Sequence, residues 1–260
     1  MINKGRLLED EIIYFLNNKK PCELNPNLLQ MIRDLYGIVD PNLPIKCEYA
    51  IDLTKPDFVI TYMDHKQYVS MKTGASTVVH KEQLSTFIKY LKEIGVSDKT
   101  IETILLYQYG DGTTDGTGKE RMATDKLKYV LSDRIKEANK ELNVSKELII
   151  KVMDRVMFQG VNPNVPAANA LYHGDIEYGV TVHKKQFIKY IKSKNFDWIS
   201  NLHCGPLFIK PSARYADKPI NNEARRHMVE ISWPRLSDDM RYIGNHYDNY
   251  TPLRYRTHEE

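Results

Sequence analysis

The segment from residue 57 to residue 73 constrains the fold most, because it has the pattern of a β-hairpin. Its first half, Asp57 to Ile60, and its second half, Tyr68 to Met71, are rich in β-branched and aromatic residues. Such residues favour strands, and the polar pair Asp64-His65 between them favours a turn. The sequence therefore predicts two neighbouring strands early in the chain.

Amphipathic helices are predicted on both sides of this hairpin. Residues 5–18 and 82–94 place apolar side chains three and four residues apart, as one face of a helix requires. Asn25 and Pro26 have the signature of a helix N-terminus, and Gly37 is typical of the position after a helix. This order of helices and strands predicts an α/β fold, with a mixed central sheet flanked by helices.

The rest of the chain is predicted to be helical and then mixed. A glycine-rich acidic loop at residues 110–118 precedes two helices, and a linker with two prolines covers residues 162–169. The expected elements are helices over 98–109, 119–142, 145–158, 184–192 and 236–243, and strands near 48–53, 176–182, 207–210 and 227–233. They suggest a core over 1–109, a helical segment over 110–162 and a helical-plus-β portion over 163–260, or one continuous domain.

Composition excludes several classes of protein. The net charge of +3 is too small to indicate a nucleic-acid-binding protein by itself. The three cysteines are scattered, which argues against a disulfide framework and against a zinc site of the CxxC type. The chain has no run of about 18 apolar residues, and charges of both signs lie near its N-terminus. We therefore expect no membrane span, and a cytoplasmic protein.

Asp57, Ser70 and Lys72 are the candidate functional residues of the hairpin. Side chains alternate along a strand, so Ser70 and Lys72 share a face, and pairing of the two strands brings Asp57 near them. A carboxylate can bind Mg²⁺, which polarises a phosphate and lowers the pKa of bound water. A lysine ammonium can orient that water or stabilise developing charge. Such a set suits metal-assisted hydrolysis of phosphodiesters.

At these residues the sequence resembles the PD-(D/E)XK nuclease superfamily, which includes many restriction endonucleases. The aspartate that follows Pro56 corresponds to the metal ligand of the family, and Lys72 corresponds to its catalytic lysine. Ser70 departs from the family pattern, which usually has aspartate or glutamate two residues before the lysine. A subgroup of restriction enzymes instead has Ser/Thr-x-Lys and takes the missing carboxylate from a glutamate on the following helix.

The resemblance implies which other acids complete the site. Glu82 fits the glutamate of the following helix, and Glu9 fits a glutamate that the first helix of the family often turns toward the site. Asp10 and Glu11 are alternates to Glu9. The resemblance thus implies a metal site of Asp57 with Glu82 or Glu9, supported by Ser70, with Mg²⁺ as the metal and Mn²⁺ as a substitute.

The expected function is cleavage of double-stranded DNA by a restriction-endonuclease-like enzyme that acts as a homodimer. The alternative is a non-catalytic DNA-binding or assembly protein that keeps the nuclease fold. A third interpretation, a structural protein without a nucleic-acid role, predicts no salt-sensitive DNA binding.

The C-terminal third contains the candidate DNA-contacting residues. Arginine and lysine bind phosphates, and arginine also reads guanine edges in the major groove. The basic residues predicted to contact DNA are Lys210, Arg214, Arg225, Arg226 and Arg235. The loop at residues 110–118 lacks the acidic spacing of a calcium site, so a flexible loop that reaches over DNA or clamps a partner is the functional hypothesis for it.

Overall fold

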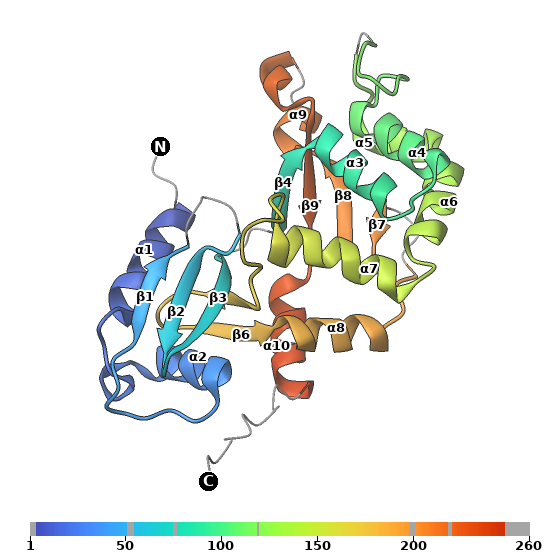
Figure 1. The fold of residues 1–260 in the computed structure, drawn as a ribbon. Helices are drawn as coiled ribbons and strands as arrows, with labels where there is room; N and C mark the ends of the chain where they lie inside the picture. Colours follow the sequence, from blue (N-terminus) through green and yellow to red (C-terminus); the bar gives the residue numbers. More distant parts are fainter. Residues whose placement is uncertain are drawn as a thin grey trace. The chain divides into compact units, whose positions relative to one another are not determined.

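The computed structural model describes residues 4–50, 55–74, 77–118, 120–197, 201–217 and 220–247. The chain forms two compact units, each built from separate stretches of sequence (Figure 1). Unit 1 contains residues 1–74, 163–190 and 237–260, and unit 2 contains residues 75–162 and 191–236. The units therefore interleave along the chain. None of the helices described is long and apolar enough to cross a membrane.

Unit 1 is organised around a five-stranded sheet in the order β1-β2-β3-β5-β6. All neighbours are antiparallel except β3 and β5, which run parallel with Lys72 beside His173. The predicted mixed sheet is thereby confirmed. Its strands are β1 (Lys46–Tyr49), β2 (Phe58–Tyr62), β3 (His65–Lys72), β5 (Ala170–Gly174) and β6 (Gly179–His183).

The predicted hairpin is formed by β2 and β3. Tyr62 pairs with His65, and the two residues between them, Met63 and Asp64, have φ angles of 51° and 60°. Positive φ at both central residues is the geometry of a two-residue turn that matches the twist of the strands. The turn lies one residue earlier than the sequence predicted, and the pairing brings the two predicted strands together.

Helices cover both faces of this sheet. The helices α1 (Lys4–Leu16) and α2 (Pro26–Tyr36) pack on one face, where Ile12, Phe58 and Val69 belong to a common core. The predicted start of α2 is confirmed, because the Asn25 side chain accepts a hydrogen bond from the backbone N–H of Leu28. On the other face, Gly244 of α10 (Leu236–His246) lies against Val180 and Val182 of β6.

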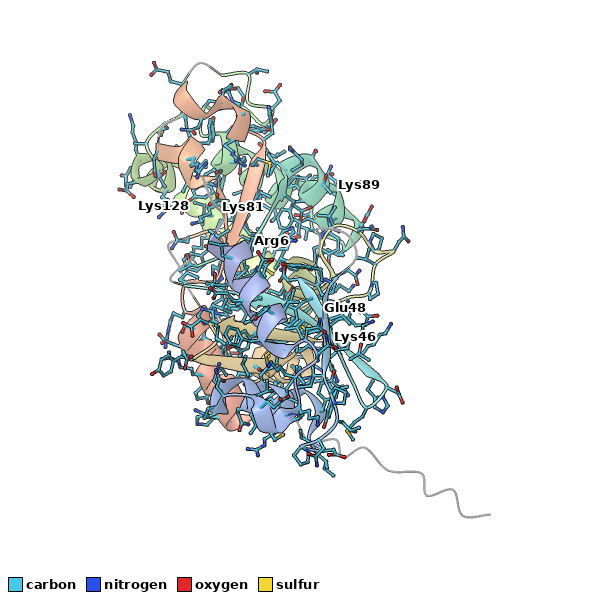
Figure 2. All side chains as sticks on the ribbon, turned by 90° about the vertical axis from the view of Figure 1, so that its left-hand side faces the viewer. Arg6, Lys46, Glu48, Lys81, Lys89 and Lys128 are labelled. Atoms are coloured by element: carbon cyan, nitrogen blue, oxygen red, sulfur yellow. The ribbon has the colours of Figure 1, made fainter. Side chains whose placement is uncertain are left out.

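The edge strand β1 is covered rather than open. Its exposed side chains Lys46 and Glu48, labelled in Figure 2, form an ion pair of 2.9 Å. The chain that follows α1 occupies the outer side of the strand: the Asn17 side chain accepts from the backbone N–H of Cys47, and the backbone N–H of Asn18 donates to the carbonyl of Ile45. Covering an edge in this way prevents pairing with a further strand.

Unit 2 is built on a four-stranded antiparallel sheet in the order β4-β9-β8-β7, with most of its helices between β4 and β7 in the sequence. The strands are β4 (Val78–Gln83), β9 (Met228–Ser232), β8 (Leu207–Pro211) and β7 (His203–Cys204). The helices are α3 (Leu84–Glu93), α4 (Asp98–Tyr109), α5 (Thr124–Val130), α6 (Ser132–Leu142), α7 (Lys146–Met153) and α9 (Ala213–Asp217). The shorter turns are η2 (Asp154–Gln159) and η3 (Ile220–Arg225), and in unit 1 η1 (Pro21–Glu23); α8 (Lys184–Ser193) follows β6.

Three sequence-based boundaries need correction. The helix predicted over residues 82–94 begins at Leu84, because residues 78–83 form β4 and pair with β9. The single helix predicted over 119–142 is two helices that meet at Leu131, and residues 120–123 are not helical. The strand expected over 48–53 starts at Lys46, and residues 51–53 of that prediction lie outside the described residues.

Candidate active site

Asp57 lies directly before β2 and is held against β3 by two hydrogen bonds. Its backbone N–H donates to the carbonyl of Val69 at 2.9 Å, and its Oδ2 accepts from the backbone N–H of Met71 at 2.5 Å. The carboxylate is therefore fixed beside the part of β3 that contains Ser70 and Lys72.

Ser70 and Lys72 point away from the core that α1 and α2 cover. The intervening residues, Val69 and Met71, belong to that core, so alternation along the strand turns Ser70 and Lys72 to the other face. Ser70 is fully buried, and its Oγ has no hydrogen-bond partner among the described residues. A buried hydroxyl without a partner costs about 1–3 kcal/mol. It is therefore a candidate to bind a group that comes from outside the chain.

Glu9 of α1 is close enough to this hairpin for charged residues of the hairpin to shift its pKa. It lies one turn before the buried Ile12 and is itself half-buried. Burial raises the pKa of Glu9, and the negative charge of Asp57 raises it further, while Arg6 and Lys72 act in the opposite direction. Glu9 is thus within electrostatic range of Asp57 and Lys72, although Lys72 leaves the face of β3 opposite to the one that α1 covers. The alternates to Glu9, Asp10 and Glu11, are exposed.

Lys55 is a residue of this site that the sequence analysis missed. Its side chain is buried, and the pKa of its ammonium lies well below the ordinary range. Burial is the main cause, the positive charge of Lys72 adds to it, and Asp57 opposes it. A lysine before a proline is usually read as a solvated residue, so nothing in the sequence signals this burial.

The donor set fits magnesium. Among the described residues no group of three or more histidine, cysteine, aspartate or glutamate side chains could hold a metal ion. Mg²⁺ needs fewer ligands from the protein, because it keeps several waters and takes one or two carboxylates together with phosphates of the substrate. Asp57 and Glu9 offer two carboxylates, and Ser70 offers a buried hydroxyl that has no partner among the described residues.

Glu82 is placed differently from the sequence expectation. It lies in β4 of unit 2, not on a helix, and its side chain is buried. Its Oε1 lies 3.1 Å from His80 Nε2, and its Oε2 lies 2.9 Å from Arg155 Nη2. Burial acts to raise the pKa of Glu82, but hydrogen bonds from these two residues outweigh it, so the pKa lies below its ordinary value. Its role as a metal ligand stays a prediction.

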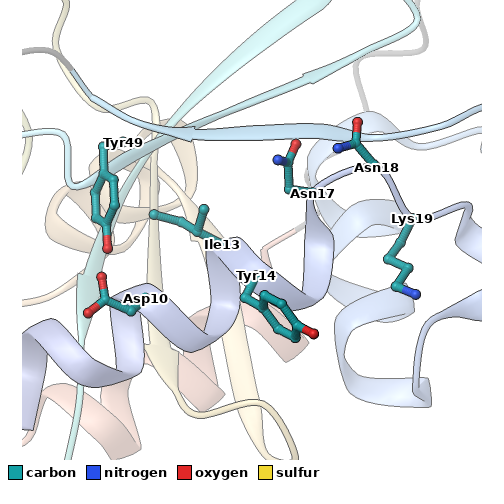
Figure 3. A pocket seen from close by; sticks show the side chains of 7 residues that line it. All are labelled: Asp10, Ile13, Tyr14, Asn17, Asn18, Lys19 and Tyr49. Atoms are coloured by element: carbon teal, nitrogen blue, oxygen red, sulfur yellow. The ribbon is translucent and has the colours of Figure 1, made fainter.

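A hollow of about 460 Å³ in unit 1 lies between α1 and β1, outside this residue set (Figure 3). It is lined by residues that include Asp10, Tyr14, Asn17 and Tyr49, and by none of the predicted catalytic residues. This hollow is therefore not the candidate active site, which we assign to Asp57 and its charged neighbours Glu9 and Lys72.

The residues predicted to contact DNA all lie in unit 2, in different surroundings. Arg214, Arg225 and Arg235 are exposed, and Lys210 is half-exposed on β8. Arg226 differs, because its side chain is 18% exposed and its Nη1 lies 2.6 Å from Glu223 Oε1. Direct DNA contact by these residues stays a prediction.

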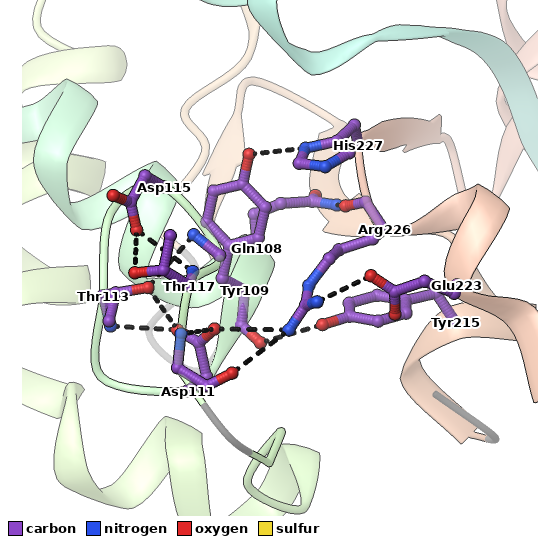
Figure 4. A network of polar contacts seen from close by, with 12 residues as sticks. Gln108, Tyr109, Asp111, Thr113, Asp115, Thr117, Tyr215, Glu223, Arg226 and His227 are labelled. Atoms are coloured by element: carbon purple, nitrogen blue, oxygen red, sulfur yellow. Dashed lines mark hydrogen bonds and ion pairs between the residues drawn. The ribbon is translucent and has the colours of Figure 1, made fainter. Parts of the chain in front are cut away.

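Arg226 belongs to a polar network that holds the loop at residues 110–118 (Figure 4). Its Nη2 lies 3.6 Å from Asp111 Oδ2, and Asp111 in turn accepts hydrogen bonds from the backbone N–H groups of Thr113 and Gly118. Gly116 has φ +78°, and a Cβ there would lie 2.7 Å from the Tyr109 ring. The loop therefore has a fixed, hydrogen-bonded base where the sequence suggested a flexible segment.

Comparison with known proteins supports the fold. No family model matches the sequence, and no curated protein is significantly similar to it. Among solved structures, the chain is similar to restriction endonuclease MspI in complex with its cognate DNA, with a TM-score of 0.50 and 13% identity over 87% of this chain and 88% of that one. At this identity the likeness establishes the fold: a mixed α/β structure of the restriction-endonuclease type.

Proposed function

We propose that this protein is a Mg²⁺-dependent endonuclease that hydrolyses phosphodiester bonds in double-stranded DNA, with a Ser-x-Lys form of the PD-(D/E)XK motif. The observation that carries the proposal is the Asp57 carboxylate, which the backbone N–H of Met71 holds between Ser70 and Lys72 on β3. The influence of Asp57 and Lys72 on the pKa of Glu9 adds a second acid to this set. The likeness to MspI, whose structure contains its cognate DNA, adds support, because that fold is known to engage the proposed substrate.

Each residue of the set has a distinct proposed role. Asp57 and Glu9 would hold the metal, with Mn²⁺ as a substitute for Mg²⁺. The bound metal supplies Lewis-acid polarisation of the phosphate and a more acidic water. Lys72 donates a hydrogen bond to the attacking water and stabilises the charge that develops on the phosphate oxygens. Ser70 has an unpartnered hydroxyl that can orient a water in this set.

The electrostatics favour capture of a cation. The ionised carboxyls of Glu9 and Asp57 repel each other, which contributes to the raised pKa of Glu9. If Glu9 and Asp57 held a divalent ion, this repulsion would be offset, and metal binding would lower the pKa of Glu9 and release protons at a pH near its pKa. This argument does not need Glu82, which already has two partners in unit 2.

The direct test is cleavage of plasmid DNA by the purified protein with Mg²⁺. Lys72→Ala should lower the cleavage rate by about 10²–10⁴-fold, the range for loss of a group that assists proton transfer or stabilises developing charge. Lys66→Ala is the matched control, because Lys66 lies on the same face of β3 but is exposed. Cleavage that persists in Lys72→Ala at the rate of the control would reject the site, and cleavage in the presence of EDTA would reject the metal.

A second function is favoured by one observation, the serine at position 70. A protein that lost the family's acid there could bind DNA without cutting it. This alternative predicts salt-sensitive DNA binding with no cleavage of varied DNAs in Mg²⁺ or Mn²⁺. The homodimer stays a prediction, and the mass of the protein–DNA complex in sedimentation experiments would test it.

A further inference from the structure

Unit 2 contains a second hollow, of about 220 Å³, formed by β8 and residues of α4, α5 and α9. Its lining combines charged and aromatic side chains with small and apolar ones. Lys128 and Lys210 provide ammonium groups, and Tyr107 and Phe208 provide aromatic rings; Thr124 adds a hydroxyl and Asp217 a carboxylate. Lys128 is among the side chains labelled in Figure 2.

The two lysines make the hollow suitable for an anion. Neither ammonium forms an ion pair within the described part of the chain, although Lys210 lies beside the buried Glu230 in the sheet. Glu230 is instead engaged by Lys81 at 2.9 Å and by the hydroxyl of Ser212 at 3.0 Å. The charge of Lys210 is therefore available to a ligand, and ammonium groups bind phosphate oxygens by charge-assisted hydrogen bonds.

The aromatic residues give the hollow a second type of contact. Phe208 and Lys210 alternate with the buried Leu207 and Ile209, so their side chains leave the same face of β8. An aromatic side chain next to a cation is the pairing that binds unstacked nucleotides, in which the ring stacks on a base and the cation binds the backbone.

We propose that this hollow binds a single unstacked nucleotide of the DNA substrate, with its base against Phe208 and its phosphate between Lys128 and Lys210. The inference deepens the proposed function and rests on it for the identity of the substrate. Asp217, the acidic residue among the lining side chains named above, offers an acceptor for an amino group of the base. Lys210, predicted from the sequence to contact DNA, receives in this way a specific role.

The first test measures binding of dAMP to the full-length protein by equilibrium dialysis in EDTA, where metal-dependent cleavage is absent. We expect dAMP to bind more tightly than either deoxyadenosine or inorganic phosphate, because it makes both types of contact. Lys210→Ala and Lys128→Ala should each weaken binding about tenfold, the effect of losing a charged hydrogen bond. Phe208→Leu should weaken binding of dAMP but not of phosphate. Lys126→Ala is the control, because Lys126 is exposed on α5 and does not line the hollow.

Equal affinity of the Lys210→Ala and Lys126→Ala variants for dAMP would overturn the proposal, as would binding of phosphate as tight as that of dAMP. A second arm identifies the source of the nucleotide. Duplex DNA should displace dAMP from the protein, and simultaneous binding of both would contradict a nucleotide of the substrate in the hollow. Asp57→Asn should bind dAMP like the unmodified protein, so a failure of the catalytic proposal would be distinguished from a failure of this one.

Discussion

Glu9 in unit 1 is half-buried and has a raised pKa, whereas Glu82 in unit 2 is more deeply buried and has a lowered pKa. Burial alone would give the opposite order, because it disfavours a charged carboxylate more as exposure falls. The difference comes from the neighbours. Glu9 has a like charge, Asp57, as its largest electrostatic contribution, and Glu82 has hydrogen bonds from His80 and Arg155.

A second acid of unit 2 follows the same rule as Glu82. Glu230 is buried, and burial acts to raise its pKa, but Lys81, Ser212 and the backbone N–H of Ala213 lower it overall. The acids of unit 2 are thus satisfied within the protein and contribute to its folding. Glu9 lacks such a balance, because burial and the charge of Asp57 leave its pKa raised, as expected of a carboxylate that binds a ligand.

The largest expected effect concerns the proposed metal ligand Asp57 in unit 1. Asp57→Asn should reduce Mg²⁺-dependent DNA cleavage by about 10³-fold or more, because it removes the charge of the proposed metal ligand. The amide oxygen can still accept from Met71, so the free energy of unfolding should not fall. Asp64→Asn, in the turn of the same hairpin, is the control for cleavage rates. Rates within twofold of that control would contradict the assignment.

The next effect concerns Glu82 in unit 2, whose carboxylate has partners within the protein. Arg155→Met should lower the free energy of unfolding by about 3 kcal/mol, because it leaves the buried Glu82 carboxylate without one of its partners. Urea denaturation at pH 7 would measure this, with Lys151→Met on the exposed side of α7 as the control. Since the pKa of Glu82 is lowered in the folded state, the stabilisation is present above its unfolded value of about 4.3 and is lost as the pH falls through the folded pKa. If the loss of unfolding free energy in Arg155→Met stayed constant down to pH 2, this would argue against the ion pair of Arg155 with Glu82.

A smaller effect is expected at the loop of residues 110–118. Arg226→Ala should destabilise this loop by about 1–2 kcal/mol, because the arginine contacts both Asp111 and Glu223. Faster amide hydrogen exchange at Thr113 and Gly118 would report the change. Arg225→Ala, which alters the exposed neighbour, should leave these amides protected. Equal exchange rates of these amides in both variants would show that Arg226 does not stabilise the loop.

The smallest expected effect is a gain in thermal stability. Glu9→Gln should raise Tm slightly, by about 1–2 °C, at pH 7 without metal, because it removes a carboxylate that is ionised at a cost next to Asp57. The pKa of Glu9 is raised in the folded state, so the penalty grows as the pH rises through that pKa and disappears below the unfolded value. Glu11→Gln, on the exposed side of α1, is the control. A lower Tm in Glu9→Gln than in this control would refute the comparison.

Local signals in the sequence predicted much of unit 1. Asn25, Pro26 and Gly37 defined α2 because capping depends on a few adjacent residues. The hairpin of β2 and β3 was predicted for the same reason, since its pairing joins residues close in sequence. The candidate residues Asp57 and Lys72 could be named because both lie on that hairpin.

Features that depend on distant residues could not be predicted. The strand β4 is not predicted, and its last two residues, Glu82 and Gln83, are assigned to the following helix. The partners that hold β4, Glu230 for Lys81 and Arg155 for Glu82, lie far along the chain. The burial of Lys55 and the charged neighbours of Glu9 are also results of packing. The family resemblance identified Glu9 as a candidate, and the structure shows that Asp57 and Lys72 act on its charge.

The parallel pairing of β3 with β5 has a consequence for synthesis of the protein. Val69 of β3 pairs with Ala170 of β5, so the hairpin with Asp57 and Lys72 leaves the ribosome while the strand that completes the sheet is still untranslated. At about 5–20 residues per second, the nascent chain keeps the β3 edge open for about 5–20 s. During this interval the exposed edge can pair with other chains, and a chaperone that shields it would protect the yield of folded protein.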